Sequence, residues 1–321
     1  MIAAPKNNVS FLTNTRPWLW NRFIATTTLA TLLLMAGCSP SDTPERTEKE
    51  NRLQIATGAY LSQWLVSELV GPGIEARSAL PKGIEPHDAE FGAGELATLR
   101  SSTLVVGTSQ ALEVGLAKAA ASAGISEGAI FWLDSGLPAE TRKRTESDPH
   151  FWMDPNLVVE SARALAGWLQ EKLDDRQAEI DERLKSMESR LKALDLAFSK
   201  GFERCESRTF VVFHSAFTYL AERYGLIEVA VTGADPEAEP KPSDVQRAIE
   251  AAKKEKMPLV FADLEAGIEE MKEIANAAGA SVETLDPLEV EMEDETYESR
   301  MYQNLSKLMA AMRCAPSSPE R

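Results

Sequence analysis

The sequence predicts an α/β protein with two (β/α) lobes, each built on a parallel sheet and joined to the other by a long rigid helix. Short apolar runs alternate with amphipathic helical segments in residues 52–155, and the same alternation returns in residues 203–314. Strands that alternate with helices in this way form parallel sheets with helices on both faces. The stretch between them, 156–202, shows no strand pattern and is rich in charged residues with i,i+4 partners.

The elements of the first lobe, 52–155, follow from its apolar periodicity. Apolar residues at helical spacing indicate amphipathic helices, whereas the short apolar runs between them indicate buried strands. A glycine at position 124 is typical of a helix end. The strands are expected at 52–57, 75–80, 103–107 and 129–134, and the helices at 60–70, 95–102 and 111–124.

The connector, 156–202, is predicted to form two helices, the second of which links the lobes. Roughly thirty residues without Gly or Pro would form a helix of about 40 Å or more. A coiled-coil segment is the alternative, but the α/β pattern resumes directly afterwards. The second lobe, 203–314, is followed by a tail, 315–321. Its strands are expected at 209–213, 226–232, 258–263 and 281–286, and its helices at 215–225, 242–256, 267–279 and 298–313.

The N-terminal 37 residues have the pattern of an export signal. Three basic residues precede the uncharged run 23–37, which is too short for a confident membrane span. The run ends in LMAGC and resembles a bacterial lipobox, in which Cys38 is lipidated and becomes the new N-terminus. An ordinary signal peptide cleaved near Ala36 is the alternative. Residues 38–51 are polar and charged, and are expected to form a flexible tether.

Charge and cysteine content limit the classes of function. The formal net charge is −16, and it becomes more negative once the basic export signal is removed. This balance argues against a nucleic-acid partner, which needs clustered Lys and Arg. Outside the cytoplasm, Cys205 and Cys314 are expected to form a disulfide, with two buried free thiols as the alternative. They have no Cys-x-x-Cys spacing, so they are not interpreted as metal ligands.

The chain has only three histidines, and their positions indicate a metal site. His214 directly follows a predicted strand, Asp286 ends another, His87 lies in a loop after a strand, and His150 lies at the entry to the connector. Ligands of open α/β sheets bind beyond the carboxyl ends of the strands, so all four side chains can face the cleft between the lobes. Three imidazoles and one carboxylate suit tetrahedral Zn²⁺. Taken singly, each residue also has the ordinary interpretation of a hydrogen-bonded histidine or a turn residue.

The stretch DPHFWMDP, 148–155, is predicted to hold His150 in one orientation. Asp-Pro on either side restricts the backbone, and Asp154 can cap the helix that begins at Pro155. Trp152 would shield a bound metal, although as a plain core residue it needs no such role. Asp154→Ala is therefore expected to weaken metal binding. Since a ligand histidine must be neutral, affinity is expected to fall below about pH 6.5.

A zinc hydrolase is the enzymatic alternative, and it would need an open coordination position and a general base. Glu85 and Glu90 are the only nearby candidates, and either is equally suited to support a ligand or to be the fourth ligand itself. The fourth ligand is expected to be Asp286, with a glutamate or a water as alternatives. The sequence therefore predicts a binding protein and not an enzyme.

Four stretches together resemble the motifs of the ZnuA/TroA-like family, the zinc- and manganese-binding solute-binding proteins of bacterial ABC importers. The resemblance implies two lobes joined by a rigid helix, with the metal held between them. A histidine at position 214 is similar to zinc-type members, whereas manganese-type members have glutamate there, so Zn²⁺ is favoured over Mn²⁺. The stretches are PHDAE (86–90), DPHFWMDP (148–155), VVFHSAFTYLAERYGL (211–226) and LDPL (285–288).

The resemblance also implies a function. A monomeric extracytoplasmic protein, anchored to a bacterial membrane through Cys38, would capture Zn²⁺ and deliver it to an ABC permease and its ATPase. A manganese-delivering member, a surface adhesin and a periplasmic zinc store are the alternatives, although a store would be expected to have more than one histidine cluster. The chain departs from the family at 91–95, FGAGE, where the family has a proline-rich run, and at 135–147, which lacks the histidines of many zinc-type members.

Overall fold

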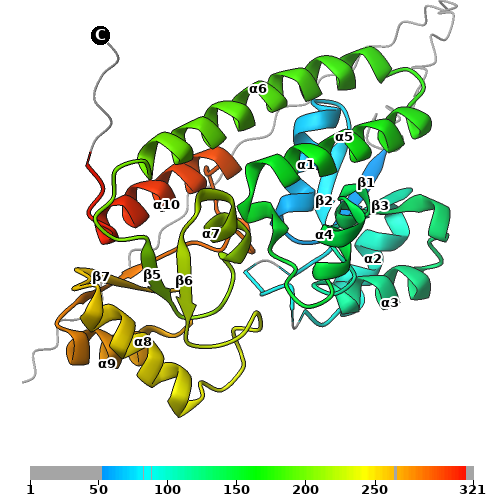
Figure 1. Cartoon of the computed structure of the whole chain (residues 1–321). Coiled ribbons are helices and arrows are strands. Elements are labelled where there is room, and N and C mark those ends of the chain that lie inside the picture. The colour runs from blue at the N-terminus through cyan, green and yellow to red at the C-terminus, as the bar shows by residue number, and fades with distance from the viewer. Residues whose placement is uncertain (1–52, 82, 88, 264–265, 316–321) are drawn as a thin grey trace, which may run out of the picture. The chain divides into compact units, whose positions relative to one another are not determined.

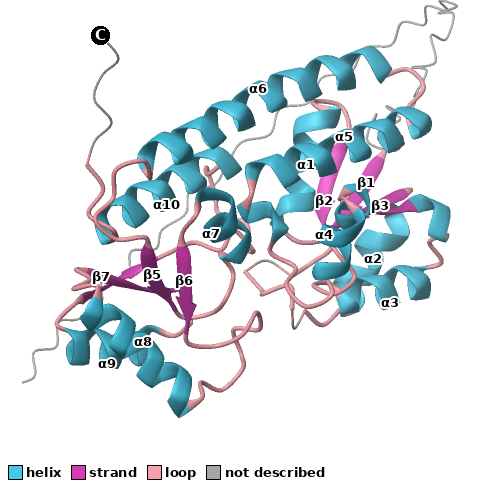
Figure 2. Cartoon of the chain, in the orientation of Figure 1, coloured by secondary structure: helices cyan, strands magenta, loops and turns pink. Residues whose placement is uncertain are grey.

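A computed structural model describes residues 53–315 except positions 82, 88, 264 and 265. The predicted export signal, the predicted tether with its lipidation site Cys38, and all of the predicted tail except Ala315 lie outside the described residues. Among the described residues, no helix combines the length and apolar character needed to span a membrane. The described chain contains two four-stranded sheets, in both of which every strand pairing is parallel (Figures 1 and 2).

The first sheet has the strand order β2-β1-β3-β4. Ile55 of β1 faces one core, with helices α1 and α5, and the next residue, Ala56, faces another, with helices α2 and α3. Both faces of the sheet are therefore covered, as expected for a parallel sheet. The strands are β1 (Gln54–Thr57), β2 (Glu75–Ser78), β3 (Leu104–Gly107) and β4 (Ile130–Trp132), and the helices are α1 (Tyr60–Val70), α2 (Ala93–Ser101), α3 (Val114–Ala123) and α4 (Ala139–Arg144). Short 3₁₀ helices are η2 (Glu127–Ala129), η3 (Leu133–Gly136) and η4 (Phe151–Met153).

The second sheet repeats this arrangement with the order β6-β5-β7-β8. Val211 and Val260 pack with helices α8 and α9, which lie together beside this sheet in Figure 1. Their neighbours Val212 and Phe261 belong to the core that includes helix α10. The strands are β5 (Thr209–Val212), β6 (Ile227–Ala230), β7 (Leu259–Ala262) and β8 (Ser281–Thr284), and the helices are α7 (Thr218–Tyr224), α8 (Pro242–Lys254), α9 (Ile268–Ala278) and α10 (Tyr297–Ala311).

Two helices connect the sheets, α5 (Pro155–Lys172) and α6 (Gln177–Gly201). The 25 residues of α6 make a helix of about 37 Å. It packs against α1 and α5 as well as α10. One helix thus contacts α1, which follows a strand of the first sheet, and α10, which follows a strand of the second. A disulfide joins Cys205, just after α6, to Cys314, just after α10. The largest hydrophobic core includes residues of both sheets, of α6 and of α10.

The predicted fold class is confirmed, and the differences are local. The helix expected at 215–225 begins only at Thr218, because the preceding residues form the turn that carries His214. The strand expected at 129–134 is limited to β4 and continues as the 3₁₀ helix η3. Helix α4 was not expected, because its six residues, AETRKR, contain one apolar side chain and give no periodic signal.

Candidate metal centre

Three histidine side chains converge on one carboxylate, that of Glu289. Its Oε1 lies 2.8 Å from Nε2 of His150, 3.4 Å from Nε2 of His87 and 3.9 Å from Nε2 of His214. His87 follows β2, His214 follows β5 and Glu289 follows β8, so three of the four side chains come from loops beyond the carboxyl ends of strands. His150 directly precedes η4.

The distances from Glu289 to the three imidazoles are close to the donor separations around a tetrahedral Zn²⁺ ion. Donor atoms about 2.0–2.1 Å from such an ion lie about 3.3 Å from one another, and the three distances to Glu289 bracket this value. Nε2 of His87, Nε2 of His214 and Oε2 of Glu289 are buried without a hydrogen-bond partner among the described residues. Buried polar atoms without partners are costly in a folded protein, and a bound cation would satisfy them.

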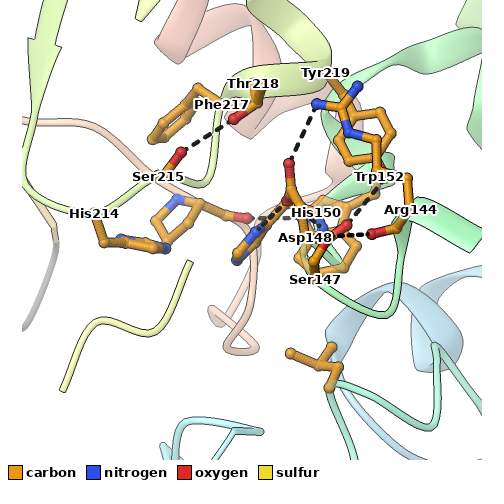
Figure 3. A network of polar contacts seen from close by, with 12 residues as sticks. Arg144, Ser147, Asp148, His150, Trp152, His214, Ser215, Phe217, Thr218 and Tyr219 are labelled. Atoms are coloured by element: carbon orange, nitrogen blue, oxygen red, sulfur yellow. Dashed lines mark hydrogen bonds and ion pairs between the residues drawn. The ribbon is translucent and has the colours of Figure 1, made fainter. Parts of the chain in front are cut away.

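His150 is fixed by the residue two positions before it. Its Nδ1 lies 3.0 Å from Oδ1 of Asp148, which also accepts a hydrogen bond from the backbone N–H of His150 at 3.2 Å. Arg144 forms an ion pair with Asp148, and the hydroxyl of Tyr219 donates to the backbone carbonyl of Asp148 (Figure 3). An Nδ1–H that donates to a carboxylate leaves Nε2 free as a metal donor.

His214 has the same arrangement with a different carboxylate. Its Nδ1 lies 2.7 Å from Oδ2 of Asp263, which follows strand β7, and both residues are buried. The Nε2 atom therefore points its lone pair toward Glu289 once Nδ1 carries the proton. Two of the three histidines are thus held by a carboxylate behind the imidazole, an arrangement that raises ligand basicity and fixes the tautomer.

The protonation of each histidine and carboxylate in this site depends on the charges of its neighbours. Burial alone would lower the pKa of His150, but the hydrogen bonds that its ring donates to Asp148 and Glu289 raise that pKa to about 9. Burial alone would raise the pKa of Glu289, but the neighbouring imidazoles of His150 and His87 hold that pKa well below its usual range. Burial and the neighbouring Glu289 raise the pKa of Glu85 to about 9. A proton on Nε2 of His150 and a cation bound to that nitrogen exclude one another.

The three predicted histidines come together, whereas the predicted Asp286 does not join them. Among the described residues, the ligand atoms of His87, His150 and Glu289 all lie within 4.8 Å of one another. His214 is outside this group, although its Nε2 lies 3.9 Å from Oε1 of Glu289. Asp286 instead forms an ion pair with the buried Arg300, which occupies both of its carboxylate oxygens. The carboxylate that lies beside the histidines is that of Glu289, and the sequence had left open a glutamate as the fourth ligand. Glu289 lies only three residues after Asp286, and this proximity in the sequence could have marked it as a candidate.

The predicted supporting residues have mixed positions. Asp154 caps α5 by accepting from the N–H of Asn156 at 2.9 Å, and it forms an ion pair with Arg223. Its contacts are therefore those of a helix cap. Trp152 packs edge-on against the His150 ring and donates from Nε1 to the carbonyl of Pro287 at 2.8 Å. Glu85 lies beside Glu289, and Glu90 is exposed.

Comparison with known proteins gives a consistent result. A family model described as zinc-uptake complex component A, periplasmic, matches residues 55–311. The chain is 25% identical over 295 residues to the zinc-binding lipoprotein AdcA of Streptococcus pneumoniae, covering 86% of this chain and 58% of the relative. It is 24% identical over 299 residues to the high-affinity zinc uptake system protein ZnuA of Bacillus subtilis, covering 87% of this chain and 94% of the relative.

Among solved structures, the AdcAII protein of Streptococcus pneumoniae superposes with a TM-score of 0.72 at 26% identity, covering 82% of this chain and 100% of that chain. The chain thus spans the whole of some relatives and little more than half the length of the AdcA lipoproteins, which are longer proteins. The similarity extends over both sheets and the connecting helices, because the matched residues 55–311 include all of them.

Proposed function

We propose that this chain, which belongs to the family described as zinc-uptake complex component A, periplasmic, captures extracytoplasmic Zn²⁺ and delivers it to an ABC importer. The observation that carries the proposal is the convergence of three imidazole nitrogens on the carboxylate of Glu289. The relatives that match over most of the chain are named as zinc-binding or zinc-uptake proteins, which supports the same cargo.

The donor set supports zinc over the manganese alternative. Three nitrogen donors and one oxygen donor suit Zn²⁺, whereas Mn²⁺ and Mg²⁺ are held mainly by oxygen ligands. Four protein donors also complete a tetrahedron, which leaves no coordination position for a catalytic water. The family is one of solute-binding proteins, and the closed donor set supports binding and release as the activity.

Capture proceeds by exchange of a proton for a metal ion. Zn²⁺ enters through the acidic cavity of about 440 Å³ that Glu85, Asp263 and Glu289 line. His150 loses its proton as the cation binds, while Asp148 and Asp263 keep the Nδ1–H groups of His150 and His214 directed away from the metal. Release to a permease needs these contacts to be loosened, and protonation of His150 provides one route.

The remaining features of the proposal concern partners and location. The protein is a monomer held at a bacterial membrane through lipidated Cys38, and its partners are an ABC permease and the ATPase of that permease. The names of the relatives support an extracytoplasmic lipoprotein. The disulfide between Cys205 and Cys314 suits an oxidising compartment.

Calorimetric titration of Zn²⁺ into chelator-stripped protein, residues 39–321, tests the function. One tight site is expected, and it should be lost in the His150→Ala, His214→Ala variant. Glu289→Gln should weaken the site, whereas Glu291→Gln, which alters a carboxylate that lines the same cavity, serves as the matched control and should leave it unchanged. Equal zinc binding by the unchanged protein and the double-histidine variant would overturn the proposal.

A further inference from the structure

Arg300, on helix α10, is a buried arginine whose contacts bracket the ligand Glu289. Its Nε and Nη2 donate to the two carboxylate oxygens of Asp286 at 2.6 and 2.7 Å, and its Nη1 donates to the carbonyl of Val290 at 2.9 Å. The side chain of Arg300 is only 1% exposed. One guanidinium thus ties together the residue three positions before Glu289 and the residue directly after it.

The turn that carries Glu289 is held on other sides as well. Asn304, one helical turn after Arg300 on α10, exchanges two hydrogen bonds with the backbone of Asp286. Leu288 has a left-handed φ of +58°, and its N–H donates to Oδ1 of Asp286 at 2.8 Å. A non-glycine residue in this region is costly and persists where the surrounding contacts fix it. The carboxylate of Asp286 is therefore part of the support of the turn.

Two carboxylates, those of Asp286 and Glu289, line the same cavity. Asp286, Glu289 and Arg300 all line the cavity of about 440 Å³, so both carboxylates border the space through which a cation would reach the histidines. Both oxygens of Asp286 are occupied by a charged, bidentate partner, which is among the stronger hydrogen-bond arrangements in proteins. Oε2 of Glu289 has no hydrogen-bond partner among the described residues.

We propose that Arg300 is the positioning residue that selects Glu289 over Asp286 as the carboxylate ligand. It neutralises and occupies Asp286, and through Val290 it fixes the turn that directs Glu289 toward the three histidines. Arg300 itself touches no metal ligand side chain, so it acts through the turn. This inference rests on the proposed zinc-binding function, since it concerns which oxygen completes that site.

A set of paired substitutions tests the selection. Glu289→Gln is made in the unchanged protein, in Arg300→Gln, and in Arg300→Gln combined with Asp286→Asn. Zinc affinity is measured by chelator competition, and Co²⁺ absorption reports the donor set of the bound metal independently of affinity. In the unchanged protein, Glu289→Gln should weaken zinc binding by about tenfold or more, in line with the loss of important metal-site contacts.

In the Arg300→Gln background the same substitution should cost about threefold or less, because the released Asp286 replaces Glu289 and the two changes are not additive. Adding Asp286→Asn should restore the full loss, since asparagine provides no anionic oxygen. The Co²⁺ spectrum should change with Arg300→Gln even when Glu289 is present. A purely structural role for Arg300 predicts none of these dependences on Asp286.

Folding and function are separated by two further measurements. Arg300→Lys keeps the buried positive charge but cannot bind both oxygens of Asp286, and it gives the same comparison if Arg300→Gln does not fold. Arg190→Lys, which alters another ion-paired arginine that contacts α10 through Glu298, is the matched control and should leave the zinc affinity unchanged. Equal loss from Glu289→Gln in all three backgrounds would overturn the selection by Arg300 and leave zinc binding intact. Failure of the unchanged protein to bind zinc would overturn both proposals.

Discussion

Two carboxylates behind the histidines, Asp148 and Asp263, decide how the site meets a cation. Each accepts from an imidazole Nδ1, and each therefore presents the corresponding Nε2 to the centre of the site. The negative charges of the two carboxylates also stabilise the protonated form of each histidine. The contacts that orient the imidazoles therefore also favour a proton that must be lost before a metal binds. Affinity at neutral pH reflects the balance of these two effects.

Zinc binding is expected to release a proton even at pH values well above the pKa of an ordinary histidine. Because the pKa of His150 is raised to about 9 in the metal-free protein, this residue is still protonated at pH 7.5 and must lose its proton to bind Zn²⁺. Apparent zinc affinity should therefore rise with pH up to about pH 9. The release of one proton for each bound ion makes this rise about tenfold per pH unit. The unperturbed histidine pKa instead predicts a decline only below about pH 6.5, so a titration from pH 6 to pH 9 distinguishes the two expectations.

Calorimetry at pH 7.5 in buffers of different ionisation enthalpy measures the number of protons released. At least one proton for each bound Zn²⁺ is expected. Asp148→Asn removes the carboxylate that supports the protonated imidazole, so it should reduce this number at the same pH. Zinc binding without proton release at pH 7.5 would show that His150 is already neutral in the metal-free protein.

The sequence suggested that Asp154 orients His150, whereas in the structure the carboxylate that contacts His150 is that of Asp148. Asp148→Ala should weaken zinc binding by about 10–100-fold, the usual effect of losing a carboxylate that supports a histidine ligand. Asp154→Ala should instead lower the free energy of unfolding by about 1 kcal/mol through the lost helix cap, with little change in zinc affinity. Chelator competition and denaturant unfolding of both variants measure the two quantities. A greater loss of affinity in Asp154→Ala than in Asp148→Ala would reverse the assignment.

The residues of the site were predictable to the extent that sequence position determines them. His87 and His214 follow strands, and parallel strands place their carboxyl ends at one edge, so their convergence follows from topology. In the selection that we propose, the choice between Asp286 and Glu289 depends on a turn with Leu288 at a positive φ and on an arginine 14 residues further along the chain. No local pattern encodes this contact, because it forms only when α10 packs beneath the turn.

At the scale of elements, the β/α order followed from the sequence because strands such as β3, β5 and β7 are short apolar runs between helices. Helix α4 and the 3₁₀ helices gave no such signal, since each is too short for a helical period to be visible. Helix α10 has two roles: it packs against α6 through its apolar side, and it presents Arg300 and Asn304 to the turn that holds Glu289. Its attachment therefore matters for both stability and the site.

The disulfide fixes the end of α10 near the end of α6, and its loss is expected to affect stability more than binding. Cys205 and Cys314 are 109 residues apart in the sequence. Closing a loop of this size stabilises a protein by about 4 kcal/mol in the chain-entropy model, and measured losses of native disulfides are typically about 2–5 kcal/mol. Denaturant unfolding of the Cys205→Ser, Cys314→Ser variant measures this loss.

Zinc affinity of the same variant provides the comparison. It should remain close to that of the unchanged protein, because Arg300 and Asn304 contact the turn from the part of α10 that precedes the disulfide by at least ten residues. An affinity loss as large as that of Asp148→Ala would show that the disulfide, and not the packing of α10, maintains the position of the turn.

For the whole molecule, the helices and the core that connect the lobes limit how far the lobes can move when zinc binds. The predicted lobes contribute to one site, since His87 and His150 precede the connector and His214 and Glu289 follow it. The largest hydrophobic core includes Ile55 of the first sheet, Phe198 of α6 and Phe261 of the second sheet. A hinge motion that separated the lobes would expose this shared core, which would cost about 25 cal/mol for each Å² of apolar surface.

Zinc binding is therefore expected to cause local movement with little rotation of the lobes. His87 lies in the loop after β2 and has the most exposed of the three ligand imidazoles, so ordering should concentrate there. Small-angle scattering of the metal-free and zinc-bound forms should give radii of gyration that agree within about 1 Å, as for small rearrangements of a pre-organised binding protein. Hydrogen exchange should meanwhile slow in the loop around His87 and in the turn around Glu289. A change of several ångströms in the radius of gyration would mean that the core shared through α6 opens in the metal-free protein, and that release to a permease uses this opening.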